Sequence, residues 1–490
     1  MSLHDLTYVL PYAFVGIGAL IVLLLGVLPG KKNNQIPYIG SIVVLLATMF
    51  QVGTLFGSDH RIENFVEINH FVLVAFELFA AGGLATILLA QNYPALNKHV
   101  DEEFYGLVLI AVLGTFLLVS SVNLLAAFIG METVAIPMFA LVAWNPRRKG
   151  AVEGAIKYAI TATVAAAFFM FGIALIYFGT GTLVIDQIPE ALGNAHAIPL
   201  LAIMGIIFLL VGIAFELALA PFHTWLADVF QASPAPVMAF IGSIAKIAML
   251  TFLISFALQI EPLWYHLESV LWALVFLSII FGNLLALRQT NAKRILAYSS
   301  VAQFGYVMMA LASVIPNDSL SMAHSVRAAA YYGFSYAIMN MVAFAVITML
   351  GKYNPTGELD GYRGLGRRFP LAGVAMAISV LSLAGIPPTA GFFAKFFLFS
   401  DVLANGHLGF VLLAVLGSAV SIFYYLRILL ALFAKQESSE ADESVNVVVN
   451  TDGTVAAEPT AFGPALVIAI CAIGTLAFGI FAQAVFNFMF

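Results

Sequence analysis

Long apolar runs separated by short polar stretches extend along the chain from beginning to end. A helix needs about 20 mostly apolar residues to cross the hydrocarbon core of a bilayer, and most of these runs have that length. We therefore predict fourteen membrane-spanning helices. They cover residues 8–28, 36–57, 71–91, 104–121, 122–143, 155–178, 198–220, 234–258, 266–287, 294–314, 328–351, 371–388, 408–433 and 463–488.

The overall composition supports this pattern. Of the 490 residues, 62% are hydrophobic and only 9% are charged, and the mean hydropathy is +1.01. Soluble domains carry about 25% charged residues, so the sequence predicts an all-α, polytopic membrane protein. The first apolar run has no basic residue before it and is too long for a signal-peptide core, so we expect it to be a retained span.

The distribution of lysine and arginine predicts the orientation of the chain. Fourteen of these residues lie in one alternating set of loops, whereas the other set contains only Arg61 and Arg327. Basic loops stay on the cytoplasmic side of a membrane. We therefore expect a multi-pass protein of the cell inner membrane with both termini on the non-cytoplasmic side.

Several ionisable residues lie inside or directly after the predicted spans, and five of them are candidates for function. Glu132, Glu216, Lys246 and Lys395 are deep in apolar sequence, where a charge costs on the order of 2.5–3.5 kcal/mol on insertion scales. Lys157 stands near the cytoplasmic end of its span, where a lysine can reach the headgroups. Removal from water disfavours the charged form of both acids and amines. Such groups suit the transfer of protons, and the pattern predicts a buried proton relay.

Prolines interrupt two of the predicted spans beside these residues. Pro221 and the Pro387–Pro388 pair each remove a backbone hydrogen bond from a helix. Irregular backbone at membrane depth is tolerated only where protein or water satisfies it, and paired broken helices mark transport sites in transporters built from repeats. His223, which titrates near neutral pH, and Lys395 lie close to the breaks. We predict that both breaks line a polar path.

Motifs for cofactor chemistry are missing from the sequence. Cys471 is the single cysteine, and there is no Gly-rich nucleotide loop and no Cys/His spacing for a metal. The chain also lacks a basic stripe for nucleic acid. We expect no cofactor in this chain, so any redox chemistry belongs to partner subunits.

Three sequence blocks carry a family resemblance: "LAPFHTWLADVFQASPAPVMAFIGSIAKIA", "KRILAYSSVAQFGYVMMAL" and "LSLAGIPPTAGFFAKFFLF". They resemble the antiporter-like, proton-channel subunits of respiratory complex I, the NADH-quinone oxidoreductase, and among these the subunit N group. The resemblance runs from about residue 104 to 434 and implies two inverted five-helix repeats, each with a discontinuous helix. The expected division is an N-terminal three-helix segment (1–103), a first repeat (104–258), a second repeat (266–434), an acidic cytoplasmic linker (435–460) and a C-terminal transmembrane helix (461–490).

The resemblance also implies roles for single residues. Glu132 matches the fifth-helix glutamate that modulates the charge of a partner lysine. Lys246 matches the eighth-helix lysine of the connecting relay, and Lys395 the twelfth-helix lysine on the exit side. Lys157 matches a sixth-helix lysine, and His223 the histidine of the seventh-helix motif.

Glu216 departs from the family pattern. The family has F-K before "PFH", with a lysine that pairs with the fifth-helix glutamate, whereas this chain has F-E. Two acids sharing a site are hard to ionise together. One interpretation is that Glu216 still relays protons, with Lys157 as the positive partner of Glu132. The other is that this half-channel is inactive and the chain only connects its neighbours.

The function implied by the resemblance is that of a membrane subunit in a proton-translocating NADH:quinone oxidoreductase. Flavin, iron–sulfur clusters and quinone are then expected in partner subunits. The partners implied are other membrane subunits, both antiporter-like and small connecting ones, and peripheral electron-transfer subunits. Two alternatives share the same motifs: a subunit of a multi-subunit cation/proton antiporter, and a structural membrane subunit with a degenerate channel.

Overall fold

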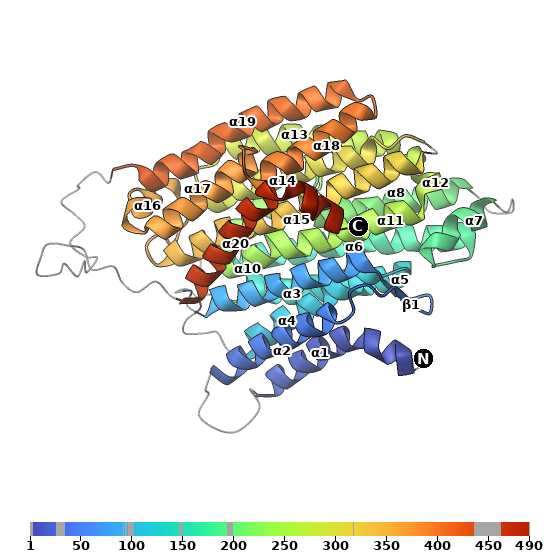
Figure 1. Ribbon diagram of the computed structural model, residues 1–490, viewed down its shortest axis with the longest axis horizontal. Helices are drawn as coiled ribbons and strands as arrows, with labels where there is room; N and C mark the ends of the chain where they lie inside the picture. Colours follow the sequence, from blue (N-terminus) through green and yellow to red (C-terminus); the bar gives the residue numbers. More distant parts are fainter. Residues whose placement is uncertain are drawn as a thin grey trace, which may run out of the picture.

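A computed structural model describes residues 3–25, 35–91, 93, 96, 102–146, 150–193, 199–316, 318–435 and 462–489. The described part is almost entirely helical, with the helices running side by side along the long axis of the molecule (Figure 1). Its only sheet is the hairpin of β1 (His60–Ile62) and β2 (Val66–Ile68), in which His60 pairs with Ile68. The predicted acidic linker lies outside the described residues, except for Lys435.

The long helices cover all the predicted spans, and α18 is an additional helix between the twelfth and thirteenth of them. They are α1 (Leu3–Leu25), α2 (Gln35–Gly53), α3 (His70–Ala90), α4 (Glu102–Ser120), α5 (Leu124–Val142), α6 (Ala151–Thr180), α8 (Pro199–Glu216), α11 (Lys246–Gln259), α13 (Glu268–Leu287), α14 (Ala292–Ala312), α15 (Ser319–Met349), α17 (Pro370–Ala384), α18 (Ala390–Ala404), α19 (Leu408–Phe433) and α20 (Phe462–Ile480). Shorter helices join or extend them: α7 (Ile188–Gly193), α9 (Leu226–Ala232), α10 (Ala235–Ala239), α12 (Glu261–Trp264), α16 (Leu365–Arg368) and α21 (Ala482–Phe488).

Twelve helices in the described part are long and apolar enough to cross a membrane, or thirteen if the bent pair that ends in α17 counts as one span. The prediction was fourteen. The difference arises at the interrupted spans: α8 ends at Glu216 and α17 at Ala384, so each is shorter than a complete span. The structure confirms an all-α, multi-pass membrane fold.

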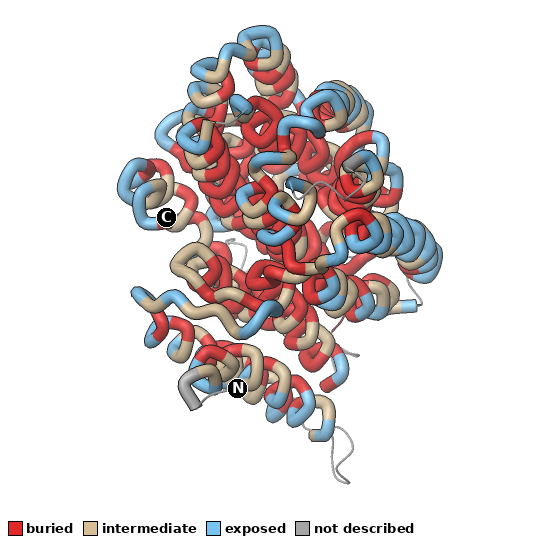
Figure 2. Tube along the Cα trace, turned by 90° about the vertical axis from the view of Figure 1, so that its right-hand side faces the viewer, coloured by how far each residue is buried: buried red, intermediate tan, exposed pale blue. Residues whose placement is uncertain are grey.

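Burial divides the helices into a central and a peripheral set. α11 and α14 both pack against α15, and the side chains of all three helices are buried on nearly all sides. Figure 2 shows the buried residues concentrated inside the bundle and the exposed ones on its outside. Peripheral helices expose large apolar side chains, such as Leu24, Phe50, Ile160 and Leu416. An apolar outer surface of this extent suits contact with lipid and with partner subunits.

The structure confirms both predicted helix breaks. After α8, Ala218 adopts a positive φ of 55°, and the N–H of Ala220 donates to Ser278 Oγ at 2.9 Å. After α17, Gly385 adopts a φ of 89°, in the left-handed region that ends many helices. Both breaks contain a cis X–Pro peptide, Ala220–Pro221 and Pro387–Pro388.

A third irregularity stands just before Lys246. Residues Phe240–Ala245 form a π-helical segment, η2, between α10 and α11. Such π-turns inside α-helices are uncommon and occur frequently at functional sites. Within it, Ser243 Oγ accepts a hydrogen bond from Asn340 Nδ2 at 2.9 Å. The segment sets the direction in which α11 presents Lys246.

Candidate functional site

Glu132, Glu216 and Lys246 lie in one neighbourhood inside the bundle. Glu132 is on α5, Glu216 is the last residue of α8, and Lys246 is the first residue of α11. Glu216 interacts electrostatically with both Glu132 and Lys246. The structure therefore brings together three of the residues proposed from the sequence, and Glu216 interacts with each of the other two.

Tyr158 adds a hydroxyl to this group that the sequence reasoning missed. It interacts electrostatically with both Glu216 and Glu132, and its ring is buried. The ring stacks on Trp225 with centroids 4.6 Å apart. Tyr158 directly follows Lys157 on α6. The same helix therefore carries both the exposed lysine and a buried phenol that interacts with the two acids.

Lys246 occupies a polar position at the first helix break. Its side chain is buried, and Nζ donates to the carbonyl oxygen of Leu217 at 3.1 Å and to Ser300 Oγ at 2.8 Å. The ring centre of Phe304 is 5.0 Å from Nζ. Leu217 directly follows the C-terminus of α8, where carbonyl groups lack helical partners and the helix dipole favours a cation. The break thus provides an acceptor for the ammonium group.

His223 lies beside this site. The residue is 7% exposed and interacts electrostatically with Lys246. Among the described residues, its Nδ1 is buried and has no hydrogen-bond partner. Buried polar atoms in folded proteins nearly always have a protein or water partner. This arrangement suits a histidine that exchanges protons through water.

Lys395 occupies the equivalent place at the second break. Its Nζ donates to the carbonyl oxygens of Leu383 at 3.1 Å and Ala384 at 2.9 Å, and to Ser418 Oγ at 2.7 Å. The side chain is 6% exposed. A Cβ at Gly385 would come within 2.9 Å of Lys395 Cδ. The glycine therefore permits both the left-handed turn and the close approach of the lysine.

Polar side chains of α14 span most of the distance between the two lysines. Ser300 contacts Lys246, and Gln303, one helical turn further on, donates from Nε2 to the carbonyl oxygen of Leu383 at 2.9 Å. That same carbonyl accepts a hydrogen bond from Lys395. Nε2 of Gln303 also donates to the hydroxyl of Tyr425 at 3.0 Å, and the hydroxyl of Tyr332 donates to Gln303 Oε1. The two breaks are therefore joined through α14, with a single gap between Ser300 and Gln303.

Sequence reasoning missed this connection, although a signal was present. The block "KRILAYSSVAQFGYVMMAL" places Ser300 and Gln303 three residues apart on an otherwise largely apolar helix. Residues with that spacing lie on the same helix face. The tyrosines, in contrast, come from α15 and α19, and nothing in the sequence specifies that these helices meet at Gln303.

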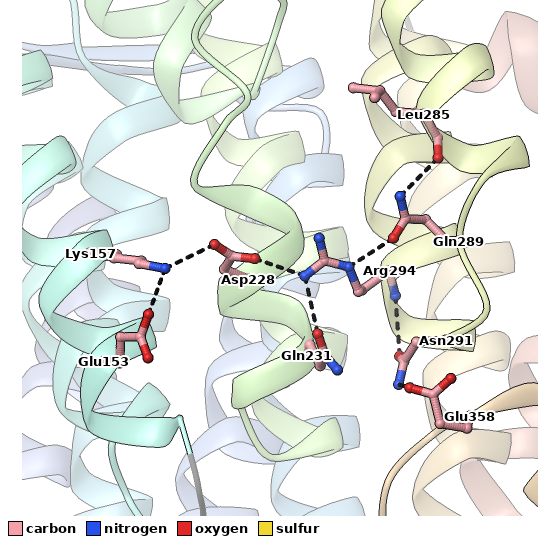
Figure 3. Close-up of polar contacts among 9 residues, drawn as sticks. All are labelled: Glu153, Lys157, Asp228, Gln231, Leu285, Gln289, Asn291, Arg294 and Glu358. Atoms are coloured by element: carbon pink, nitrogen blue, oxygen red, sulfur yellow. Dashed lines mark hydrogen bonds and ion pairs between the residues drawn. The ribbon is translucent and has the colours of Figure 1, made fainter.

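Lys157 lies apart from the buried row. Its Nζ forms ion pairs with Glu153 Oε1 at 2.7 Å and with Asp228 Oδ2 at 3.1 Å, and 46% of its side chain is exposed. The other oxygen of Asp228 pairs with Arg294 Nη1 at 2.7 Å (Figure 3). The interpretation of Lys157 as the positive partner of Glu132 is therefore wrong, because two other carboxylates hold its ammonium.

The surroundings of Lys157 form a charged cluster at one end of the bundle. Four residues of alternating charge extend from α6 through α9 to α14: Glu153, Lys157, Asp228 and Arg294 (Figure 3). A hollow of 680 Å³ beside them is lined by Glu153, Lys157, Asp228 and Glu358, among other residues. The cluster ties the short second half of the first broken helix to the bundle on both sides.

Comparisons with known proteins agree with this architecture. The family described as "NADH:quinone oxidoreductase/Mrp antiporter, TM" matches residues 121–421, which include both breaks and all the candidate residues. The chain belongs to this family. The family match begins after the first four long helices and ends within α19.

Two relatives named as subunit N match most of the chain. The NADH-quinone oxidoreductase subunit N of Geobacter metallireducens is 36% identical over 438 residues, covering 89% of this chain and 90% of that protein. The subunit N of Psychrobacter arcticus is 32% identical over 475 residues, covering 94% of this chain and 95% of that protein.

Two solved structures have the same fold as this chain. A chain of respiratory complex I from Thermus thermophilus aligns with a TM-score of 0.79 and 32% identity, covering 97% of this chain and 98% of that chain. A chain of the Mrp complex from Dietzia sp. aligns with a TM-score of 0.83 over 99% of this chain and 96% of its own, at 19% identity. The second likeness shows the shared family fold alone.

Proposed function

We propose that this chain is the subunit N type component in the membrane arm of a proton-pumping NADH-quinone oxidoreductase. The observation that carries the proposal is the row of ionisable groups inside the bundle, from the half-buried Glu132 and Glu216 to the buried Lys246 and Lys395. Relatives above 30% identity named as subunit N support this assignment over the cation/proton antiporter, for which the Mrp structure offers only the fold.

In this proposal the chain moves protons and carries no redox chemistry. Electrons pass to quinone through flavin and iron–sulfur clusters in partner subunits, and the chain couples to that reaction through contacts in the membrane. Other antiporter-like and small connecting subunits lie beside it in the cell inner membrane, with both chain termini on the non-cytoplasmic side. The two repeats, 104–258 and 266–434, each contribute one helix break.

The first break exchanges protons between an acid and an amine. Glu216 interacts electrostatically with both Glu132 and Lys246, and Lys246 is its positive partner. A change in the charge of Glu132 alters the stability of the charged form of Glu216, because like charges at close range disfavour each other. This arrangement keeps the half-channel active despite the replacement of the family lysine by Glu216. His223 supplies a second proton-exchanging group beside Lys246.

The proton reaches the second break along the polar side chains of α14. Deprotonated Lys246 accepts a proton from Glu216 or His223, and water ordered along Ser300 and Gln303 carries it to the amine of Lys395. The two lysines keep their positions because carbonyl groups at the helix breaks hold their ammonium groups. Each transfer moves one proton and leaves the donor ready to be protonated again.

A comparison of three lysines tests the proposal. In membrane vesicles containing the assembled complex, Lys395→Ala and Lys246→Ala are expected to lower the number of protons pumped per electron. Lys157→Ala is the matched control, because its ammonium lies in an exposed ion-pair cluster. Equal proton-to-electron ratios in wild type and in both buried-lysine variants, at equal assembly, would overturn the proposed relay.

A further inference from the structure

A second group of polar side chains lies on the outer side of Lys395 and has no part in the relay described above. It comprises Ser313, just after α14, Ser321 and Ser325 on α15, and Asp401 and Asn405 on α18 and at its end. We call these five residues the outer polar cluster. α14 starts next to the basic, cytoplasmic loop and ends beside Ser313, so in the proposed orientation the cluster faces the non-cytoplasmic side.

Hydrogen bonds connect the members of this cluster across three helices. Ser325 Oγ donates to Asp401 Oδ2 at 2.7 Å. Asn405 Nδ2 donates to Ser313 Oγ at 3.3 Å and to Ser325 Oγ at 3.4 Å, and Ser321 Oγ donates to Asn405 Oδ1 at 3.3 Å. The three serines are buried, whereas Asp401 and Asn405 are partly exposed. The cluster therefore reaches from the interior of the bundle to its surface.

Asp401 is connected to Lys395 by the helix that carries both. The two residues are six positions apart on α18, which corresponds to about 9 Å along the helix axis. Lys395 lies at the break, and Asp401 lies toward the outer end of the same helix. Water between the two side chains would have to carry a proton from one to the other.

The charged groups around Asp401 leave its carboxylate able to accept a proton. From α15, His324 interacts electrostatically with it, and Ser325 provides a hydroxyl. From its own helix the nearest cation is Lys395. Within the described residues, no lysine or arginine forms an ion pair with Asp401, in contrast to Asp228, which two cations hold. Asp228 is a fixed ion-pair partner, whereas the groups that interact with the Asp401 carboxylate in the described part of the chain are the hydroxyl of Ser325 and the imidazole of His324.

We propose that Asp401 is the proton-release group of this chain. The ammonium of Lys395 gives a proton through water to the carboxylate of Asp401, which leaves a neutral amine and a carboxylic acid. The acid then releases the proton to the outer aqueous phase and becomes a carboxylate again, while Lys395 is protonated anew from α14. This inference rests on the proposed relay function and adds the group that releases the proton at the outer end of the relay.

Substitution at Asp401 tests the proposal in the assembled complex. Asp401→Asn still accepts the hydrogen bond from Ser325 but cannot carry a proton, so proton pumping is expected to fall by about a hundredfold or more, the contribution typical of a positioned proton-transfer group. Asp401→Glu keeps a carboxyl and is expected to restore most of the pumping. A purely structural aspartate would show the reverse order, because asparagine keeps its size and glutamate does not.

Lys395→Ala, measured in parallel, separates the two proposals. Impaired pumping in Lys395→Ala with normal pumping in Asp401→Asn would overturn the release role alone. Normal pumping in Lys395→Ala would overturn the relay itself.

Water access provides a second test that leaves Asp401 in place. In a Cys471→Ser background, Ser325→Cys places the only thiol of the chain beside Asp401. A charged, membrane-impermeant thiol reagent added to the outer face of spheroplasts is expected to label this chain and to inhibit pumping. A chain that remains unlabelled from the outer face, although denaturation exposes a reactive thiol, would contradict the release path.

Discussion

At the break between α8 and α9, the lysine that reaches the freed carbonyl comes from another helix, whereas at the break between α17 and α18 it comes from the broken helix itself. Lys246 donates to Leu217 from the start of α11, and Lys395 donates to Leu383 and Ala384 from α18. The first break also carries an acid, Glu216, at the C-terminal end of its helix. The second break has a serine hydroxyl on the neighbouring helix α19 instead.

This difference separates two kinds of proton site. A carboxylate at a helix C-terminus is disfavoured by the helix dipole, so Glu216 depends on Lys246 for a positive neighbour, and the two can exchange a proton within one break. Lys395 has no acid within hydrogen-bonding distance in the described structure and must receive its proton through α14. The first break is therefore a donor–acceptor pair, and the second is a single carrier.

The largest effect is expected from Lys246→Ala. In the proposed path this lysine takes the proton from Glu216 at the first break and passes it on toward Lys395 at the second. The variant removes the positive partner of Glu216 and the contact to Ser300. We expect proton-coupled quinone reduction to fall by at least about tenfold, equivalent to about 1.4 kcal/mol in the barrier. The matched variant Lys157→Ala is expected to retain most of the activity. A comparable loss in the two variants, at equal assembly, would remove the distinction between buried and exposed lysines.

Substitutions at the two turns are expected to have opposite outcomes. Gly385→Ala places a Cβ 2.9 Å from Lys395 Cδ at a φ of 89°, and the left-handed conformation alone costs about 1–2 kcal/mol. Ala218→Gly relieves the strain of an alanine with a φ of 55° at an entropic cost of about 0.5–1 kcal/mol. The stability of this variant complex should therefore remain near that of the wild type. Thermal stability and pumping of the two purified variant complexes provide the comparison. Tolerance of Gly385→Ala would show that Lys395 does not need its present position.

Glu216 tests whether the first break is an acid–amine pair. Glu216→Gln keeps the shape but cannot exchange a proton, and we expect it to impair pumping severalfold. Glu216→Lys restores the family residue beside Glu132 and is expected to recover activity, although a buried charge without its partner costs several kcal/mol. Pumping assays on both variants decide the question. Full activity in Glu216→Gln would favour the interpretation of a degenerate half-channel.

The smallest effect is expected from the serines that contact the lysines. Ser418→Ala removes one of three hydrogen bonds to Lys395, and Ser300→Ala one of two to Lys246. A hydrogen bond to a charged group contributes about 1.5–3 kcal/mol, and the remaining acceptors offset part of this loss. We expect a modest reduction in pumping rate that is larger for Ser300→Ala, since Lys246 keeps fewer acceptors. The reverse order would indicate that water already replaces the serine at Lys246.

The sequence predicted the fold and the positions of the breaks, because apolar run length and proline act locally. It could not assign partners to the lysines. Asp228 lies seven residues after Pro221, and Lys395 lies seven residues after Pro388. Asp228 nevertheless belongs to the exposed ion-pair cluster, whereas Lys395 is buried at the second break. Those environments depend on which helices pack together. The positive φ of Ala218 had no sequence signal either, since alanine normally avoids that conformation.

The central claim is that protons cross from the first break to the second through α14, and Gln303 is the residue that tests it most directly. Gln303→Leu keeps the approximate volume and leaves both lysines in place, but removes the polar contacts to Leu383, Tyr425 and Tyr332. The measurement is the number of protons pumped per electron by the reconstituted complex, with Gln303→Glu as the polar control. The account predicts a lower ratio in Gln303→Leu and a ratio near wild type in Gln303→Glu. An unchanged ratio in Gln303→Leu, at full assembly, would contradict a path through α14.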